Sequence, residues 1–212
     1  MLLFGHTGIT AGVVKACEIL ISMNSPVSQY QPDSSLKFAT VIRRVRSRLC
    51  DLLDGVKGRI GPIDYRLVLL GSLLPDIIDK PVWLIANGLA SNTSLSGHDY
   101  AHTLLFNLAL FIGGLVLIRY RKSWLLIISL SSLMHLILDQ MWHSPEVLLW
   151  PLLGSLPKLE TAGWLPDIFE ALFSCPEVYI PEIIGLVIVL LFAGRLVRKK
   201  SVVSFIRDGD IR

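Results

Sequence analysis

Charged residues are scarce in this sequence. They make up 17% of its 212 residues, whereas hydrophobic residues make up 52%, and a soluble globular domain usually carries about 25% charged residues. This composition excludes a disordered chain, collagen and a coiled coil. It favours an integral membrane protein over the alternative, a soluble bundle of buried helices.

Cysteine is scarce as well, and the usual nucleophile motifs are missing. The three cysteines, Cys17, Cys50 and Cys175, are far apart and odd in number, which fits neither a metal knuckle nor a disulfide framework. The sequence contains no nucleophilic serine motif, no phosphate-cradling glycine loop and no CxxC pair. No cleavable signal peptide is evident. The five histidines, which lie inside or at the ends of apolar segments, are more informative.

Five apolar segments predict an all-α integral membrane protein with about five transmembrane helices. A helix rises about 1.5 Å per residue, so about 17–20 residues cross a bilayer. Each segment is long enough to span when its flanking residues are included. The segments cover approximately residues 2–22, 66–90, 103–118, 123–138 and 178–194.

The basic residues predict how these segments are oriented. Of the 20 lysines and arginines, eight lie in 37–66, three in 119–122 and six in 195–212. These regions are alternate connections plus the C-terminal tail, and the opposite connections contain only Lys80 and Lys158. Cytoplasmic loops carry such an excess, so we expect the N-terminus outside and the C-terminus in the cytoplasm. The net charge of +3 then reflects topology, not binding to nucleic acid.

The same pattern predicts a single membrane domain, residues 1–212, that crosses the inner cell membrane several times. Residues 23–62 are expected to form a cytoplasmic basic loop, whose run 43–48 is a further candidate for contact with anionic lipid. Residues 140–177 are expected to form an outer connection along the membrane interface, because tryptophans such as Trp150 and Trp164 prefer that depth.

Several ionisable residues lie where a membrane would disfavour them. An aspartate within a span costs about 2.5–3.5 kcal/mol, so a partner must offset that cost. The predicted topology, which made no use of these residues, brings them to the outer side at a similar depth. They are His6, Asp76, Asp79, His102, His135 and Asp139.

Imidazoles and carboxylates at one depth form a ligand set suited to zinc, manganese or iron. We expect a divalent metal, zinc before manganese, and one or two ions, since the six candidates exceed the three protein ligands of a typical catalytic zinc. The carboxylates Asp76, Asp79 and Asp139 are also the catalytic candidates, because one that does not bind metal can act as general base. The structural alternatives are turn or cap roles for Asp76 and Asp79, a hydrogen-bonded pair of His135 with Asp139, and a helix-end role for His102.

Other polar residues nearby are weaker candidates for metal ligands. His98 is four residues before His102, and His143 follows Trp142, so both are minor metal candidates. Asp99 is interpreted as a loop charge and Arg66 as a cytoplasmic anchor.

Four sequence pieces, in this order, resemble the YdjM-like family of membrane-bound metal-dependent hydrolases. They are Gly5–Thr10 (GHTGIT), Leu73–Asp79 (LLPDIID), His102–Leu105 (HTLL) and His135–Asp139 (HLILD), and they cover roughly residues 1–145. The resemblance implies a mostly helical membrane protein whose His/Asp set binds metal, with a likeness to zinc-dependent phospholipase C. Two features depart from the family pattern: Gly97–Thr103 (GHDYAHT) replaces a His-Arg-Gly stretch, and residues 23–62 look like an insertion.

The sequence therefore predicts a membrane-embedded metal-dependent hydrolase. Water activated by the metal would attack an ester, such as a lipid phosphate ester, at the outer membrane–water interface, and membrane lipid is the expected partner. The alternatives are a metal-ion or proton transporter and a non-catalytic membrane protein with a structural metal. Transport is disfavoured because the inner halves of the last three segments contain no carboxylate.

Overall fold

The computed structural model describes residues 2–23, 58, 61–89, 99–154, 170 and 172–211. Every regular element in these ranges is a helix, which confirms the all-α prediction. The long helices are α1 (Leu3–Met23), α3 (Tyr65–Leu89), α4 (Leu104–Ile118), α5 (Trp124–Leu138) and α8 (Pro176–Arg198). Three short ones are η1 (Met141–His143), α6 (Pro145–Leu148) and α9 (Val202–Asp208).

The five long helices coincide with the five predicted apolar segments. Among the described residues, one helix, α8, is both long and apolar enough to cross a membrane. Helices α4 and α5 are apolar but have only 15 residues each. The helical segments are thus confirmed, whereas the number of spans stays a prediction.

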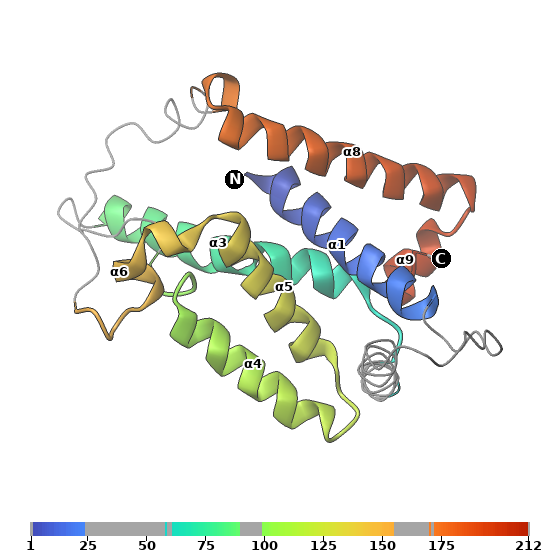
Figure 1. Ribbon diagram of the computed structural model, residues 1–212, viewed down its shortest axis with the longest axis horizontal. Helices are drawn as coiled ribbons and strands as arrows, with labels where there is room; N and C mark the ends of the chain where they lie inside the picture. Colours follow the sequence, from blue (N-terminus) through green and yellow to red (C-terminus); the bar gives the residue numbers. More distant parts are fainter. Residues whose placement is uncertain are drawn as a thin grey trace, which may run out of the picture.

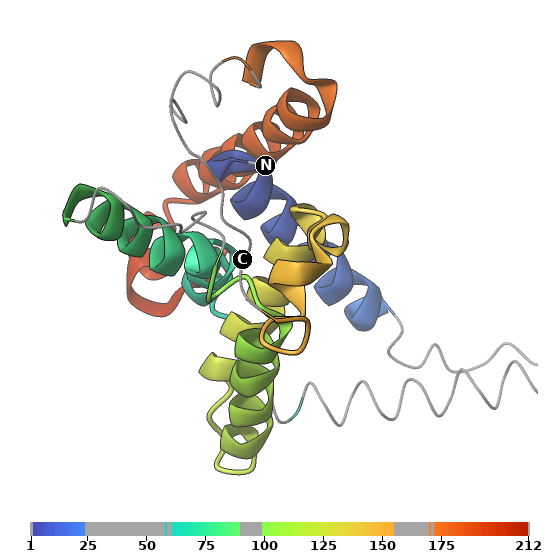
Figure 2. The ribbon, with the colours of Figure 1, turned by 90° about the vertical axis from the view of Figure 1, so that its left-hand side faces the viewer.

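The helices form a bundle in which α1, α3 and α5 occupy the middle (Figure 1). Helix α5 packs against α3 and α4, and α1 packs against α8, α3 and α5. Helices α4 and α8 consequently lie on opposite sides of the bundle, as Figure 2 also shows. This arrangement brings the beginning of α1, the middle of α3 and the end of α5 together.

Glycines allow two of these helix pairs to approach closely. A Cβ atom at Gly8 would overlap the carbonyl of Gly185, and one at Gly185 would overlap the carbonyl of Phe4, so α1 and α8 touch backbone to backbone. A Cβ at Gly71 of α3 would lie 2.6 Å from the carbonyl oxygen of Ile128 in α5. Small residues at helix crossings are typical of membrane proteins, in which close packing drives association.

The C-terminal segment packs against the other end of the bundle. The guanidinium of Arg66 bonds both oxygens of Asp64 and donates to the carbonyls of Ile206 and Arg207 in α9. The amide of Tyr65 donates to the carbonyl of Gly209 at 3.0 Å. Arg66, interpreted as an anchor from the sequence, therefore ties α9 to the start of α3.

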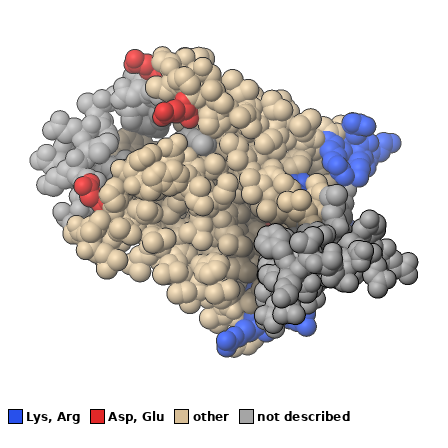
Figure 3. Space-filling model, in the orientation of Figure 1, with Lys and Arg blue, Asp and Glu red and all other residues tan. Residues whose placement is uncertain are grey.

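Charges on the surface are segregated. In Figure 3 the basic side chains lie at one end of the bundle and the acidic ones at the other. The exposed basic residues include those of the α4–α5 connection and of the end of α8, whereas exposed Glu146, Glu170 and Glu177 belong to the opposite connection. This distribution agrees with the predicted grouping of the basic residues.

The two predicted connecting regions are only partly described. Of residues 23–62, only Met23, Gly58, Gly61 and Pro62 belong to the described part of the chain, and nothing tests the expected basic loop. The expected outer connection 140–177 contributes η1 and α6, the first residues of α8 and a few residues between them, whereas residues 155–169 and 171 lie outside the described residues.

Candidate metal centre

Four helices bring the six predicted residues into one buried cluster. His6 lies in the first turn of α1, Asp76 and Asp79 lie in α3, and His135 lies in the last turn of α5. His102 precedes α4, and Asp139 is the C-cap of α5. The three histidines are 0% exposed and Asp79 is 1% exposed. Both aspartates of α3 are inside the helix, so they are not turn or cap residues.

The ring of His135 has a defined orientation. Its Nδ1 lies 2.7 Å from the backbone carbonyl oxygen of Ser72 in α3. A carbonyl only accepts hydrogen bonds, so Nδ1 carries the proton, and in a neutral imidazole the other nitrogen is then an acceptor. Nε2 of His135 consequently presents a lone pair to the cluster.

His102 is held in the same way by Asp79. Its Nδ1 lies 2.8 Å from Oδ2 of Asp79, and that carboxylate also accepts the backbone N–H groups of residues 99–102 at 2.9–3.3 Å. A carboxylate that accepts so many donors is ionised, so Nδ1 of His102 donates and Nε2 presents a lone pair. Carboxylate or carbonyl partners on the far ring nitrogen are typical of metal-binding histidines.

The two presented nitrogens face each other and two carboxylates. Nε2 of His135 lies 3.2 Å from Nε2 of His102 and 3.2 Å from Oδ2 of Asp139. Oδ1 of Asp76 lies 3.7 Å from Nε2 of His102 and 3.9 Å from Nε2 of His135. If both rings are neutral, these four atoms present lone pairs to one another, an arrangement that a bound metal ion or a shared proton would stabilise.

His6 completes the cluster from α1. Its ring stacks on that of His135, with centroids 3.9 Å apart and an interplanar angle of 20°. Its Nε2 lies 3.1 Å from Oδ1 of Asp139, but neither ring nitrogen of His6 makes a hydrogen bond of acceptable geometry in the described part of the chain. A buried imidazole with both nitrogens unsatisfied is costly, and a bond to a metal would satisfy one of them.

Asp76 divides its two oxygens between Lys80 and the cluster. Lys80, one turn away, donates to Oδ2 at 2.6 Å, and the side chain of Lys80 is 42% exposed. Oδ1 is buried and makes no hydrogen bond with any described residue. Together, the carboxylates Asp76, Asp79 and Asp139 and the ammonium of Lys80 leave a formal excess of two negative charges, which a divalent cation would balance.

The spacing of the potential ligand atoms also fits a metal ion. Zinc binds nitrogen and oxygen at about 2.0–2.2 Å, which places tetrahedral ligands about 3.3 Å apart. The two distances of 3.2 Å agree with that spacing. Two overlapping groups, His6 with Asp76 and His135, and His102 with His135 and Asp139, each have ligand atoms within 4.8 Å of one another. His135 belongs to both groups but can bind only through Nε2, because its Nδ1 donates to Ser72, so the cluster suits one divalent ion.

Sequence reasoning missed a polar contact behind the cluster. Asn107 of α4 is 0% exposed and accepts a hydrogen bond of 2.6 Å from the hydroxyl of Ser132 in α5. Its amide nitrogen donates to the carbonyls of Ala101 and Thr103 at 3.0 Å and so holds the turn that carries His102. The sequence could have indicated that Ser132 lies near the cluster, because Ser132, His135 and Asp139 are three and four residues apart and share one helix face.

Among the other polar residues noted in the sequence analysis, His143 and Asp99 have different surroundings. His143 lies in η1, is exposed and packs against Trp142, outside the cluster. His98 lies outside the described residues. Asp99 lies in the turn before α4, which fits its interpretation as a loop charge, but it is only 2% exposed, and its amide donates to Asp79. The turn buries it because residues 99–102 wrap around the Asp79 carboxylate.

Comparisons with known proteins agree with the sequence resemblance. No curated protein and no solved structure matches this chain significantly. A family model described as YdjM inner membrane protein matches residues 1–202, nearly the whole chain. The described residues of this chain include a His/Asp cluster able to bind metal. The family match shows that the chain belongs to the YdjM family of inner membrane proteins.

Proposed function

We propose that this protein is a membrane-embedded metal-dependent hydrolase that acts on esters, with lipid phosphate esters as the preferred class. The convergence of four potential ligand atoms, from His102, His135, Asp76 and Asp139, supports the metal most directly. The membrane location favours a lipid as substrate, because a site within the bundle is reached most readily from the bilayer.

The residues have separable roles in this proposal. His6, His102, His135, Asp76 and Asp139 hold the ion, and Asp79 orients His102 through its Nδ1–H. A bound divalent ion supplies a Lewis acid for the ester oxygen and acidifies water to a pKa near 7. Asp76 is assigned as a ligand through Oδ1, because that oxygen is unsatisfied among the described residues and faces His102 and His135, while Lys80 holds Oδ2.

We also propose the topology derived from the basic residues: five spans, the N-terminus outside and the cluster toward the outer surface. The opposite placement of acidic and basic side chains in Figure 3 supports it. A bundle with two helices of 15 residues spans only if flanking residues or local thinning of the bilayer contribute.

The test compares two histidines only eight residues apart. The detergent-purified wild type should contain zinc or manganese at near-stoichiometric amounts and hydrolyse a phosphodiester or phospholipid. His135→Gln should lower metal affinity by more than the 10–100-fold typical of outer-shell changes and abolish hydrolysis. His143→Gln, at an exposed position, should leave both unchanged. A wild type that holds less than about a tenth of an equivalent after metal resupply would refute the metal site.

A transporter is the second candidate, because the polar contact of Asn107 with Ser132 extends the cluster into the α4–α5 interface. Intramembrane polar chains of this kind also line ion pathways. Metal flux into sealed vesicles that requires His135, in a protein without hydrolase activity, would favour this function over hydrolysis.

A further inference from the structure

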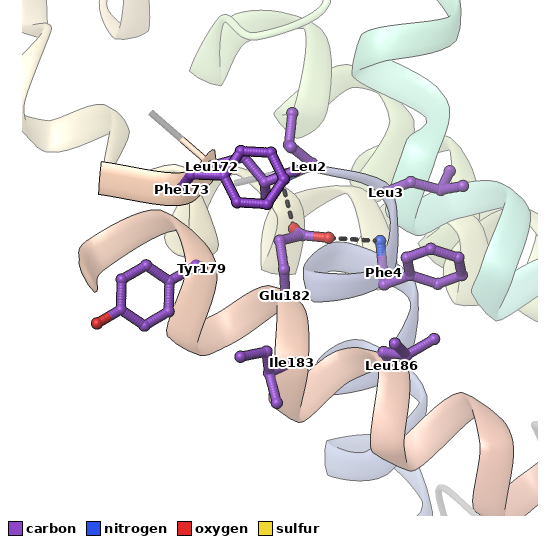
Figure 4. Close-up of a pocket in the computed structure, with 9 residues that line it drawn as sticks. All are labelled: Leu2, Leu3, Phe4, Leu172, Phe173, Tyr179, Glu182, Ile183 and Leu186. Atoms are coloured by element: carbon purple, nitrogen blue, oxygen red, sulfur yellow. Dashed lines mark hydrogen bonds between the residues drawn. The ribbon is translucent and has the colours of Figure 1, made fainter. Parts of the chain in front are cut away.

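One pocket of the described structure lies apart from the metal ligands. It lies between the beginning of α1, the beginning of α8 and the preceding residues Leu172 and Phe173, and its volume is about 630 Å³ (Figure 4). Its walls are aliphatic and aromatic apart from Glu182. A volume of this size lies within the range of small-molecule sites, about 300–1,000 Å³.

The one carboxylate in the wall is already satisfied. Glu182 is 7% exposed, and its two oxygens accept the backbone N–H groups of Leu2 at 2.5 Å and Phe4 at 3.0 Å, as the dashed lines in Figure 4 show. These are donors at the beginning of a helix, which have no partner within the helix itself. Because none of the described residues that line the pocket is basic and Glu182 is acidic, an apolar group is preferred to an anion.

The pocket and the metal cluster share the first turn of α1. Leu2 lines the pocket, and its carbonyl accepts the backbone N–H of His6 at 3.4 Å. Leu3 and Phe4 are exposed on the pocket side, whereas Gly5 and His6 are buried. About one helical turn, roughly 5 Å along the axis, therefore separates the pocket from the cluster.

The pocket is continuous with a face of α8 that the described residues leave exposed. Ile183 in the pocket is 57% exposed, and Leu190 and Leu191 farther along α8 are 60% and 67% exposed. Only 11% of the apolar stretch of this helix is buried. In a membrane protein, such a face lies against lipid acyl chains, so a chain that enters the pocket never leaves an apolar environment.

We propose that this pocket binds one acyl chain of a membrane phospholipid and thereby brings the ester of its head group to the metal cluster. The proposal rests on the proposed hydrolase function for its purpose, but the pocket makes a separate prediction about binding. The phosphate would lie toward the cluster and its cation, and the chain would run along the α1–α8 interface away from Glu182.

The experiment fills the pocket and leaves the cluster intact. Leu186→Trp places a larger side chain in the wall, and Leu190→Trp, one turn along the same helix and outside the pocket, is the matched control. Ile183→Trp, at a more exposed wall position, is a second filling variant that is easier to accommodate. Each protein is photolabelled in detergent with a phosphatidylglycerol that carries a diazirine in one acyl chain, and the labelled peptides are mapped.

We expect the wild type and Leu190→Trp to be labelled within residues 172–186 and both filling variants to lose about tenfold of that labelling. Loss of contact with two methylene groups is enough for such a change. Where hydrolysis is measurable, the filling variants should lose about tenfold on a long-chain phospholipid and retain activity on a water-soluble short-chain analogue.

The outcomes separate the two proposals. Equal labelling of all variants, or labels that map elsewhere, would overturn the acyl-chain site. Pocket labelling that the filling variants abolish, in a protein with no hydrolysis of any ester, would uphold the site and refute the hydrolase. Equal loss of long-chain and short-chain activity with unchanged labelling would also count against the pocket, since it indicates damage to the cluster.

Discussion

The close crossing of α1 and α8 makes a quantitative prediction for Gly185→Ala. The added Cβ would overlap the carbonyl of Phe4 and lie 2.8 Å from Cα of Gly5. Carbon atoms need about 3.5 Å or more, so the helices must separate there by about 1 Å. No rotamer change can relieve the overlap, because the atoms in the way belong to the backbone.

The cost follows from two contacts. Overpacking of this kind costs about 1–3 kcal/mol, and separation of the helices weakens the bonds from Leu2 and Phe4 to Glu182, which adds about 1 kcal/mol. A total of about 2–4 kcal/mol lowers the melting temperature of a protein of this size by roughly 5–15 °C. His6 moves with α1, and because binding sites tolerate only about 0.5 Å of displacement, metal content should fall as well.

The assay is thermal unfolding in detergent together with metal analysis, and α8 supplies its own control. A Cβ at Gly194 would meet no atom within 4 Å, so Gly194→Ala should be neutral or stabilise the helix by up to about 1 kcal/mol. If Gly185→Ala melted at the same temperature as Gly194→Ala and kept its metal, the backbone contact between α1 and α8 would not exist.

Three further predictions concern pH, the C-terminal segment and topology. Acidification should release the metal, since imidazole and carboxylate ligands must be deprotonated to bind; metal retained at pH 4 after dialysis would contradict this ligand set. The Arg66 guanidinium holds the pKa of Asp64 below its usual value. The contact between Arg66 and α9 should therefore be intact above pH about 3.9 and lost as the pH falls through the lowered pKa. Asp64→Asn should mimic this loss and speed hydrogen exchange in residues 202–208 at neutral pH, and unchanged exchange would contradict the prediction. In a cysteine-free background, Lys122→Cys should be labelled from the cytoplasm and Ser144→Cys from outside, and labelling of both from one side would refute the topology.

The helices were predictable because their ends coincide with strong local signals. Thr103 is an N-cap whose hydroxyl accepts the amide of Phe106 at 3.2 Å, and the apolar run after it stops at Arg119. The prediction of 103–118 therefore agrees with α4 within one residue. Helix α9 was not predicted, because its seven residues give a weak pattern and its position depends on Arg66, far away in the sequence.

Convergence of the six cluster residues could be predicted, but their partners could not. The alternation of basic and non-basic connections was enough to predict that the helix ends with these residues lie on one side. Whether a facing ring nitrogen carries a proton or a lone pair depends on the hydrogen-bond partner of the other nitrogen of that ring. For His135 that partner is the carbonyl of Ser72, a backbone atom that no sequence pattern specifies.

Asp76 and Asp79 illustrate the limit best. By spacing alone they are equivalent, three residues apart on one helix face, and both were candidates for metal and for catalysis. The structure distinguishes them by what reaches each carboxylate: the turn of residues 99–102 saturates Asp79 with backbone donors, whereas Lys80 leaves one oxygen of Asp76 unsatisfied. That turn comes from a segment some 20 residues later in the chain and is held by Asn107 of α4. The difference between these two carboxylates is therefore a property of tertiary structure, and the local sequence does not indicate it.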